Sequence, residues 1–420
     1  MDRDAALKIP GGTDRPGISA PLYPLRFWVV LSLLLLFCIV LKLPTLSSPH
    51  EEPDERVYMA LATRMLHAGS YNLAGTEILK ELPPGVYDRP LFHHPPLFPA
   101  ALVPFVYLGV EKAGVVVSWL GHFLCIISVA LIGRRIAFAY GLATDRHALV
   151  SWLPVIGICL DPLLIFISRK LWIDSILAGL CAVSIAAFFC ARYSQRRSFL
   201  LLLGGLLFGL ANLTKITALI FTPLVVYLIL TPEGLRRPKI SELCLGFLPA
   251  ALLVLPWYVI FYHTYGAIVP SWTKPDDWLI QHYPFVRVAL ARTPLYYFLK
   301  LALIAPVSVI SIGAYVVTRS LWTSKISLVP VLWFVLCFAA ISYLGLRGYT
   351  FQMRYIAQIV PSIYLMFYAP LALFPGNRDI VSVAGLLLLI YGGMTGAIYL
   401  LASNYDEVYS LFEIVGWVRL

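Results

Sequence analysis

The sequence has 420 residues, of which 60% are hydrophobic and 13% are charged. That composition, with a mean hydropathy of +0.82, excludes a soluble globular protein and predicts a polytopic membrane protein. The formal net charge of +10 does not indicate a nucleic-acid partner, because the basic residues stand in short clusters between apolar runs. All seven cysteines lie in or beside apolar runs without a C-x-x-C spacing, which argues against disulfides and a cysteine zinc site.

The N-terminal segment predicts the orientation of the chain. Residues 1–25 are polar and contain glycine and proline, which is typical of a disordered cytoplasmic tail. The first apolar run, about Phe27 to Leu43, is long enough to span, and no small-residue cleavage site follows it, so we expect a retained helix. Arg26 marks its inner end, and Lys42 is expected to snorkel at its outer end. Residues 44–96 then form the first external loop.

This loop is predicted to hold two helices at the membrane surface. From Asp54 to His67, acidic residues in the first turn suit the positive end of a helix dipole, and apolar residues recur at helical spacing. We expect this segment to form an amphipathic helix that lies on the membrane. Pro95 and Pro96 start a second short helix, from which the chain returns through the membrane.

Further apolar runs follow, each long enough or nearly long enough to span. They lie at about residues 114–132, 147–167, 173–190, 200–213, 218–230, 243–262, 297–317, 328–346, 356–373 and 380–401. Basic clusters fall on one side of these runs, with Arg169 and Lys170 as the main exception. The expected fold class is an all-α polytopic membrane protein with about eleven transmembrane helices. Its N-terminus is expected inside and its C-terminus outside.

The domain organisation follows from these runs. We expect one membrane domain over residues 26–401, with no separate soluble domain. Residues 263–293 form a second large external loop, and residues 402–420 form an external tail. The second loop is rich in Trp, Tyr and Pro, which fits either an interfacial aromatic belt or stacking on sugar faces.

A dense acidic cluster begins the first external loop. Glu51, Glu52, Asp54 and Glu55 place four carboxylates within five residues, beside the membrane. For this cluster alone two interpretations stay open: a solvated cap, or a catalytic group that faces water. The loop ends on a His-His-Pro-Pro-Leu segment before the chain becomes apolar again.

Four segments in this order resemble motifs of the GT-C superfamily of membrane glycosyltransferases, which use polyprenyl-phosphate sugars. The segments are Asp54-Glu55, His94 to Leu97, Ser168 to Leu177 and Leu213 to Lys215, with weaker similarity at Pro256 to Tyr258 and Arg354-Tyr355. The nearest branches are the protein O-mannosyltransferases and the bacterial aminoarabinose lipid A transferases. The similarity covers about residues 27–363. The sequence lacks the inserted soluble domain of the first branch and the large C-terminal domain of the second, so the acceptor stays open.

The resemblance implies catalytic roles for Asp54, Glu55 and Asp174. Sugar transfer from a lipid phosphate needs a base for the acceptor hydroxyl but no acid for the leaving group, because phosphate leaves as a stable anion. Asp54 is the expected general base, and a helix cap is the alternative for it. Asp174 starts a transmembrane run, where an acid is costly. It would bind the acceptor or orient the base, or else form a structural ion pair with Arg169 or Lys170.

Cations and loop residues complete the expected site. Lys215, Arg354 and Arg169 would bind the donor phosphate, with snorkelling as the alternative for Lys215. The substrate loop would contribute His93, His94 and Tyr58. A metal held by the histidines and acids is possible but not favoured, because their spacing is not diagnostic. No cofactor is expected.

The sequence therefore predicts an inverting glycosyltransferase that moves one sugar from a polyprenyl-phosphate donor to a hydroxyl on the extracytoplasmic face. The acceptor would be a glycolipid, such as lipid A, or a protein. The expected location is the bacterial inner membrane, or the endoplasmic reticulum membrane in a eukaryote. The alternative is a transporter or flippase of a lipid-linked sugar, but its ionisable residues would gather at the membrane midplane rather than at one face.

Overall fold

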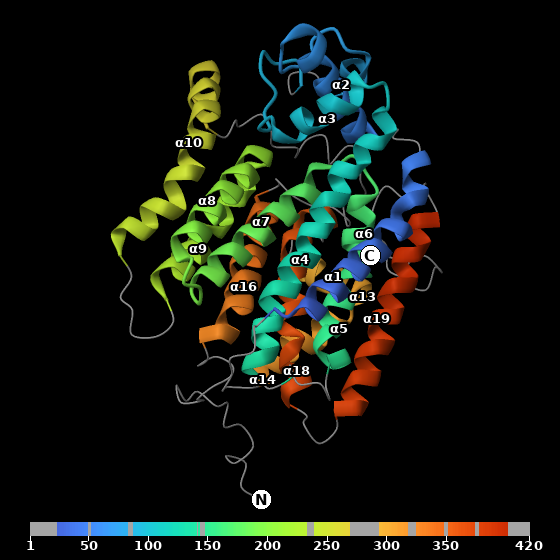
Figure 1. Cartoon of the computed structure of the whole chain (residues 1–420). Helices are drawn as coiled ribbons and strands as arrows, with labels where there is room; N and C mark the ends of the chain where they lie inside the picture. Colours follow the sequence, from blue (N-terminus) through green and yellow to red (C-terminus); the bar gives the residue numbers. More distant parts are fainter. Residues whose placement is uncertain are drawn as a thin grey trace, which may run out of the picture.

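The computed structural model is a helical bundle, in line with the expected all-α fold (Figure 1). It describes residues 23–48, 52–82, 87–140, 142, 148–232, 239–268, 294–317, 325–347, 352–373 and 378–401, among which no strand occurs. Residues 1–22 of the expected N-terminal tail at 1–25 and the expected tail at 402–420 lie outside the described residues, as do residues 269–293 of the expected second loop.

The bundle is built from long apolar helices joined by short helical turns. In chain order the elements are α1 (Leu25–Lys42), η2 (Leu43–Ser47), α2 (Pro53–Ala68), η3 (Glu77–Glu81), α3 (Leu97–Tyr107), η4 (Glu111–Gly114), α4 (Val115–Ala139), α5 (Ala148–Cys159), α6 (Pro162–Ser168), α7 (Ile173–Ala191), α8 (Arg197–Thr214), η6 (Ile216–Phe221), α9 (Thr222–Leu230), α10 (Ile240–Tyr265), α13 (Pro294–Ile304), α14 (Val307–Val317), α16 (Lys325–Leu346), η8 (Met353–Ile359), α17 (Val360–Met366), α18 (Tyr368–Leu373) and α19 (Arg378–Leu401).

Several of these helices fulfil the requirements of a membrane span. Within the described residues, seven are long and apolar enough to cross a membrane, or up to eight if α13 and α14, bent by 116°, count as one span. Three other apolar helices are shorter. The expected count of about eleven is therefore not confirmed.

Helix α7 is the central element of the bundle, with α4 and α8 packed against it. Its contact with α4 is close, because a methyl group at Gly121 would lie 2.2 Å from the carbonyl oxygen of Ser175. Small residues allow such an approach and are common between membrane helices. Since α7 begins at Ile173, this packing fixes the position of Asp174 in its first turn.

Helices α2 and α3 form a layer over one end of the bundle, at the top in Figure 1. The prediction of a helix from Asp54 to His67 is confirmed by α2, which has its acids in the first turn and ends at Gly69 in the left-handed conformation. The prediction of a second helix after Pro95 and Pro96 is confirmed by α3. The inner face of α2 is buried on α3, so the layer is fixed on the bundle.

One expectation for α1 is wrong. Lys42 does not snorkel to solvent; it is fully buried and donates a hydrogen bond to the hydroxyl of Ser168. Neighbouring residues cover this end of α1, and the indole of Trp119 in α4 reaches across to Thr45 at 3.2 Å. Snorkelling requires a free path to the interface, and this packing closes it.

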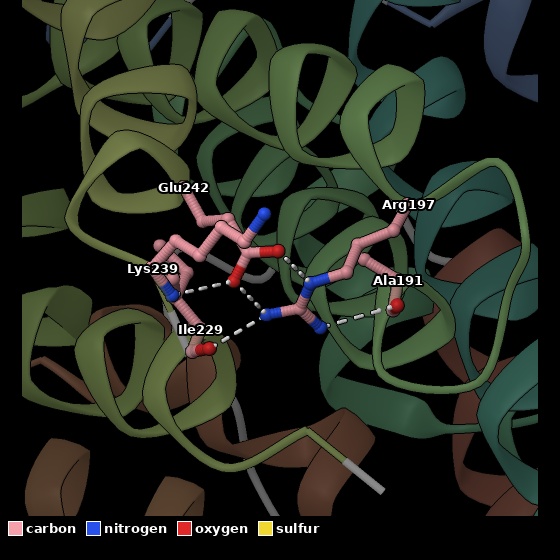
Figure 2. A network of polar contacts seen from close by, with 5 residues as sticks. All are labelled: Ala191, Arg197, Ile229, Lys239 and Glu242. Carbon is pink, nitrogen blue, oxygen red and sulfur yellow. Dashed lines mark hydrogen bonds and ion pairs between the residues drawn. The ribbon is translucent and has the colours of Figure 1, made fainter. Parts of the chain in front are cut away.

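At the other end of the bundle, a buried ion pair joins helices α8 and α10 (Figure 2). The guanidinium of Arg197 donates to both carboxylate oxygens of Glu242 at 2.9 and 3.1 Å, and to the carbonyl oxygens of Ala191 and Ile229. Glu242 also accepts a hydrogen bond from the backbone N–H of Lys239. The network thus links the ends of α7, α8, α9 and α10.

Candidate active site

Four charged side chains meet beneath the first turn of α2. Arg354 Nη2 lies 2.5 Å from Asp54 Oδ2, and Arg354 Nε lies 3.7 Å from Asp174 Oδ2. Lys215 Nζ lies 3.1 Å from the other oxygen of Asp174. Acid and cation therefore alternate in the order Asp54, Arg354, Asp174 and Lys215, which we call the charged chain.

Its members come from four separate elements. Asp54 and Asp174 lie in the first turns of α2 and α7, where the helix dipole favours a negative charge. Lys215 follows the last residue of α8 in an extended conformation, with φ −158° and ψ 136°. Arg354 lies in η8. Because α7 leaves this end of the bundle and α8 returns to it, Asp174 and Lys215 meet although they lie 41 positions apart in the sequence.

Aromatic rings support both cations. The guanidinium of Arg354 lies 4.3 Å from the ring centroid of Trp172, and Lys215 Nζ lies 4.3 Å from that of Tyr355. A cation over an aromatic face is stabilised by the charge distribution of the ring. The two cations are thus held on one side by aromatic faces and on the other by carboxylates.

Exposure differs sharply along the charged chain. The side chain of Asp54 is 39% exposed, whereas those of Arg354, Lys215 and Asp174 are 11%, 9% and 3% exposed. A general base has to reach the proton of an incoming hydroxyl, and of the two carboxylates Asp54 is the exposed one. Asp174 is covered and contacts both cations.

The other two acids of the cluster that the structure describes, Glu52 and Glu55, contact the turn between α6 and α7. Glu55 is buried, and its Oε1 accepts a hydrogen bond from the backbone N–H of Leu171 at 2.8 Å. Glu52 forms an ion pair with Lys170. Burial raises the pKa of the Glu52 carboxyl, the nearby charge of Glu55 adds to this, and Lys170 opposes it. The acidic cluster is therefore divided between an exposed side and a packed side, while Glu51 lies outside the described residues.

The end of the first loop is held by hydrogen bonds from the side chain of Tyr71 to backbone carbonyl oxygens. Tyr71 donates its hydroxyl hydrogen to the carbonyl oxygens of His94 and Pro95 at 3.0 and 3.1 Å. The rings of His93 and His94 are partly exposed, with centroids 4.3 Å apart. Burial and the charge of Lys215 lower the pKa of His93 to about 4, although Asp54 opposes this. Burial likewise lowers the pKa of His94, so both imidazoles are neutral at neutral pH.

Tyr58 has a packing role in this loop. It is buried and makes edge contacts with the rings of Phe92 and Phe98, at centroid distances of 6.5 and 5.1 Å. Burial and the charge of Asp54 raise the pKa of its phenol, which stays protonated. Tyr58 thereby links the helix that carries Asp54 to the segment that carries the histidines.

The structure brings together Asp54, Asp174, Lys215 and Arg354, but it does not bring Arg169 to them. Arg169 donates to the carbonyl oxygen of Tyr399 in α19 and lies over the ring of Phe166. The expected ion pair of Asp174 with Arg169 or Lys170 is also not observed, since Asp174 pairs with Lys215 and Arg354 instead. A charged residue of a membrane helix can pair with a residue from any neighbouring helix, and adjacency in the sequence did not indicate which one.

Two residues of the site were missed in the sequence, namely Trp172 and Tyr355. Each lies inside a segment that the resemblance had singled out, but an aromatic residue near a membrane helix end is too common to be diagnostic. For metals, the described part of the chain holds no group of three or more His, Cys, Asp or Glu residues arranged to bind an ion.

The helical bundle that the structure describes, with an exposed carboxylate and two largely covered cations at one end, fits a membrane glycosyltransferase of the GT-C type. The sequence model of glycosyltransferase family 87 matches residues 92–345, more than half of the chain, and the protein belongs to this family. The matched range includes Asp174 and Lys215, whereas Asp54 and Arg354 lie outside it. The protein is thus an integral membrane glycosyltransferase, and the resemblance found in the sequence is confirmed.

Solved structures with a similar fold include ArnT from Cupriavidus metallidurans in two states. The apo structure aligns with a TM-score of 0.55 at 18% identity, covering 90% of this chain and 74% of ArnT. The structure bound to undecaprenyl phosphate aligns with a TM-score of 0.54 at 16% identity, covering 90% of this chain and 76% of ArnT. No curated protein matches the chain by sequence. At these identities the likeness concerns the fold alone.

Proposed function

We propose that the protein is an inverting glycosyltransferase that moves a single sugar from a polyprenyl-phosphate donor to an acceptor hydroxyl. The observation that carries this proposal is the charged chain, in which the exposed carboxylate of Asp54 lies beside two cations suited to a phosphate. The complex of ArnT with undecaprenyl phosphate, a protein of similar fold, supports the choice of lipid phosphate as the donor class.

In this mechanism Asp54 removes the proton of the acceptor hydroxyl. The acceptor oxygen attacks the anomeric carbon on the face opposite the phosphate, and the bond from that carbon to the phosphate oxygen breaks. The electron pair of that bond stays on the phosphate, where Lys215 and Arg354 stabilise the growing charge in surroundings poor in water. No acid is needed, since phosphate leaves as an anion. Asp174 keeps both cations in place.

The ion pair between Asp54 and Arg354 couples donor binding to proton removal. The charged chain has two carboxylates and two cations, so its formal charge is zero before the donor binds. A phosphate at Arg354 and Lys215 competes with Asp54 for the guanidinium. A carboxylate released from its cation is free to accept the proton of the acceptor hydroxyl. The donor thereby activates the base that its transfer requires.

The substrate-loop residues suit the sugar. Neutral His93 and His94 each have one ring nitrogen that donates and one that accepts, which matches a sugar hydroxyl. Both rings lie within electrostatic reach of Lys215, where we place the phosphate that carries the sugar. Tyr58 holds this segment in position rather than binding substrate directly.

The orientation and location belong to the same proposal. Helices α2 and α3 would lie on the extracytoplasmic face, most simply of a bacterial inner membrane, with residues 44–96 as the catalytic loop of one membrane domain. Arg134 and Arg135 at the end of α4, and Arg197 at the start of α8, lie at the opposite end of the bundle, which supports this topology. Ala74→Cys, in a background without native cysteines, should react with an impermeant thiol reagent in intact cells. Reaction only after the membrane is opened would overturn this orientation.

The acceptor would be a glycolipid, such as lipid A, or a protein. Purified protein in sealed liposomes should convert polyprenyl-phosphate sugars and an acceptor extract into a new glycoside, detected by mass spectrometry. A panel of donors that differ in the sugar identifies which one is used. Movement of the donor across the bilayer without a new glycosidic bond would contradict the proposal and favour a transporter.

A further inference from the structure

Three consecutive residues of the turn between α6 and α7 contact the start of α2 or the arginine that pairs with it. Lys170 pairs with Glu52, the N–H of Leu171 donates to Glu55 at 2.8 Å, and the ring of Trp172 lies beneath Arg354, which pairs with Asp54. We call this set of contacts the seam. It joins the helix that carries the exposed acid to the turn that supports the cation.

Asp54 and Glu55 have opposite surroundings within the seam. Successive residues of an α-helix point about 100° apart, so the two carboxylates leave α2 in different directions. Asp54 is 39% exposed, whereas Glu55 is 1% exposed, with one oxygen bound to a backbone N–H. A carboxylate in that position cannot reach an acceptor hydroxyl unless α2 moves away from the turn.

The backbone N–H of Leu171 finds its hydrogen-bond acceptor in Glu55. It lies in the short break between the end of α6 at Ser168 and the start of α7 at Ile173. A buried backbone donor without a partner is costly, and Glu55 satisfies this one from another element. The same contact fixes the rotation of α2, and with it the direction of Asp54 one residue earlier.

From these contacts we infer that Glu55 is a positioning residue and not a second catalytic carboxylate: its hydrogen bond to Leu171 sets where Asp54 stands relative to Arg354 and Asp174. This inference rests on the proposed function, because it assigns Asp54 the role of base. It differs from the interpretation of the Asp-Glu pair as two interchangeable acids. The feature of Glu55 that matters is its acceptor oxygen, not its charge.

The test compares Glu55→Gln with Glu55→Leu in purified protein, and measures turnover together with binding of undecaprenyl phosphate. Gln keeps an oxygen that accepts from Leu171 but cannot take up a proton, so turnover should stay within about threefold of wild type. Leu has no acceptor, and turnover should fall roughly 100-fold, as expected when reacting groups are displaced by about 1 Å. Binding of undecaprenyl phosphate should stay nearly the same in both variants, since Lys215 and Arg354 remain.

Further variants keep the test decisive. Glu77→Gln, at an exposed carboxylate paired with Lys80 on the same loop, is the matched control and should behave as wild type. If Glu55→Leu does not fold, Lys170→Gln breaks the neighbouring contact of the seam and should also lower turnover more than lipid-phosphate binding. An unchanged Lys170→Gln would then count against the seam.

Two results would overturn the inference. If Glu55→Gln loses as much turnover as Glu55→Leu, the ionisable carboxyl is required and Glu55 acts in catalysis. If both variants match wild type, Glu55 does not position Asp54. The variant Asp54→Asn distinguishes a failure of this inference from a failure of the proposed function. If Asp54→Asn is active, Asp54 is not the base. If it is inactive, the proposed function stands whatever the Glu55 variants show.

Discussion

The two ends of the bundle each contain arginine paired with a carboxylate in a largely covered position, but the pairs are built differently. At the end opposite α2, Arg197 and Glu242 are 3% and 6% exposed, and each makes several short hydrogen bonds (Figure 2). At the α2 end, Arg354 contacts Asp54 closely but lies 3.7 Å from Asp174, too far for a hydrogen bond.

This difference fits the proposed division between a structural ion pair and a reactive one. Arg197 and Glu242 satisfy one another and the carbonyl oxygens around them, so no polar group is left for a ligand. The side chain of Asp54 is 39% exposed, and Arg354 is shared between two acids. A loosely paired arginine can transfer its contacts to a phosphate at lower cost than one that is fully hydrogen-bonded. The network of Arg197 and Glu242 holds helices together, whereas the charged chain is suited to binding a phosphate and accepting a proton.

The largest effect on turnover is expected for a substitution of Asp54, at the α2 end of the bundle. Asp54→Asn keeps the size of the side chain but cannot accept the proton, so turnover should fall by roughly 10²–10⁴. Binding of undecaprenyl phosphate should not weaken, because the carboxylate that competes for Arg354 is gone. The measurements are turnover and lipid-phosphate affinity, with the exposed Asp88→Asn of the same loop as the control. Retention of more than about a tenth of the turnover would remove Asp54 from the role of base.

The opposite pattern, a loss of stability without a loss of turnover, is expected at the end that holds Arg197 and Glu242. Arg197→Met leaves Glu242 buried without its cation, which should lower the free energy of unfolding by about 3–5 kcal/mol. Turnover per folded molecule should stay near that of wild type, because this network is remote from the charged chain. Thermal unfolding of the purified protein measures the first quantity, and an active-protein titration measures the second. The double variant Arg197→Met with Glu242→Leu should recover part of the stability, and no recovery would argue against an unpaired acid as the cause.

Lys215 extends the comparison between the two ends. Its side chain is 9% exposed against 3% for Arg197, but it should stabilise the leaving phosphate. Lys215→Ala should raise the barrier to turnover by about 2–4 kcal/mol. It should also weaken binding of undecaprenyl phosphate, since the ground-state phosphate is already charged. Lys215→Arg should keep more activity than Lys215→Gln, and the exposed Lys80→Ala is the control. If Ala and Gln both match wild type in both quantities, Arg354 becomes the principal phosphate ligand.

The smallest effect concerns the histidines. Because the pKa of His93 is about 4 in the folded protein against 6.5 ordinarily, the unfolded chain takes up its proton first as the pH falls. The contribution of this residue to stability is present above pH 6.5 and is lost as the pH falls toward 4. The melting temperature of wild type should therefore decrease over this window, and His93→Asn should flatten part of the decrease. An identical pH dependence in the variant would show that His93 is not kept neutral by folding.

Much of the fold and part of the site could be predicted from the sequence. Acids followed by apolar residues at helical spacing predicted α2, and hydropathy with the basic clusters placed Asp174 and Lys215 at the same end. Their pairing with each other could not be predicted, since helix rotation and neighbours depend on packing such as that at Gly121. Arg354 meets Asp54 across 300 residues, a distance at which no local pattern gives information.

The division between Asp54 and Glu55 shows the same limit on a smaller scale. Two adjacent acids look equivalent in a sequence, and which of them is buried depends on the rotation of α2 on the bundle. Lys42 is a similar case, because its burial depends on residues from α4 and α6 that lie far away in the sequence. Sequence patterns predicted which residue types gather at this end, and tertiary packing decided which of them face the substrate.

The most direct test is the stereochemistry of a single turnover, followed by NMR with purified protein and a polyprenyl-phosphate sugar of known anomeric configuration. The proposed mechanism predicts a glycoside of inverted configuration, formed by wild type and Arg197→Met but not by Asp54→Asn. A product that retains the configuration of the donor, or one formed at the wild-type rate without the Asp54 carboxylate, would contradict it.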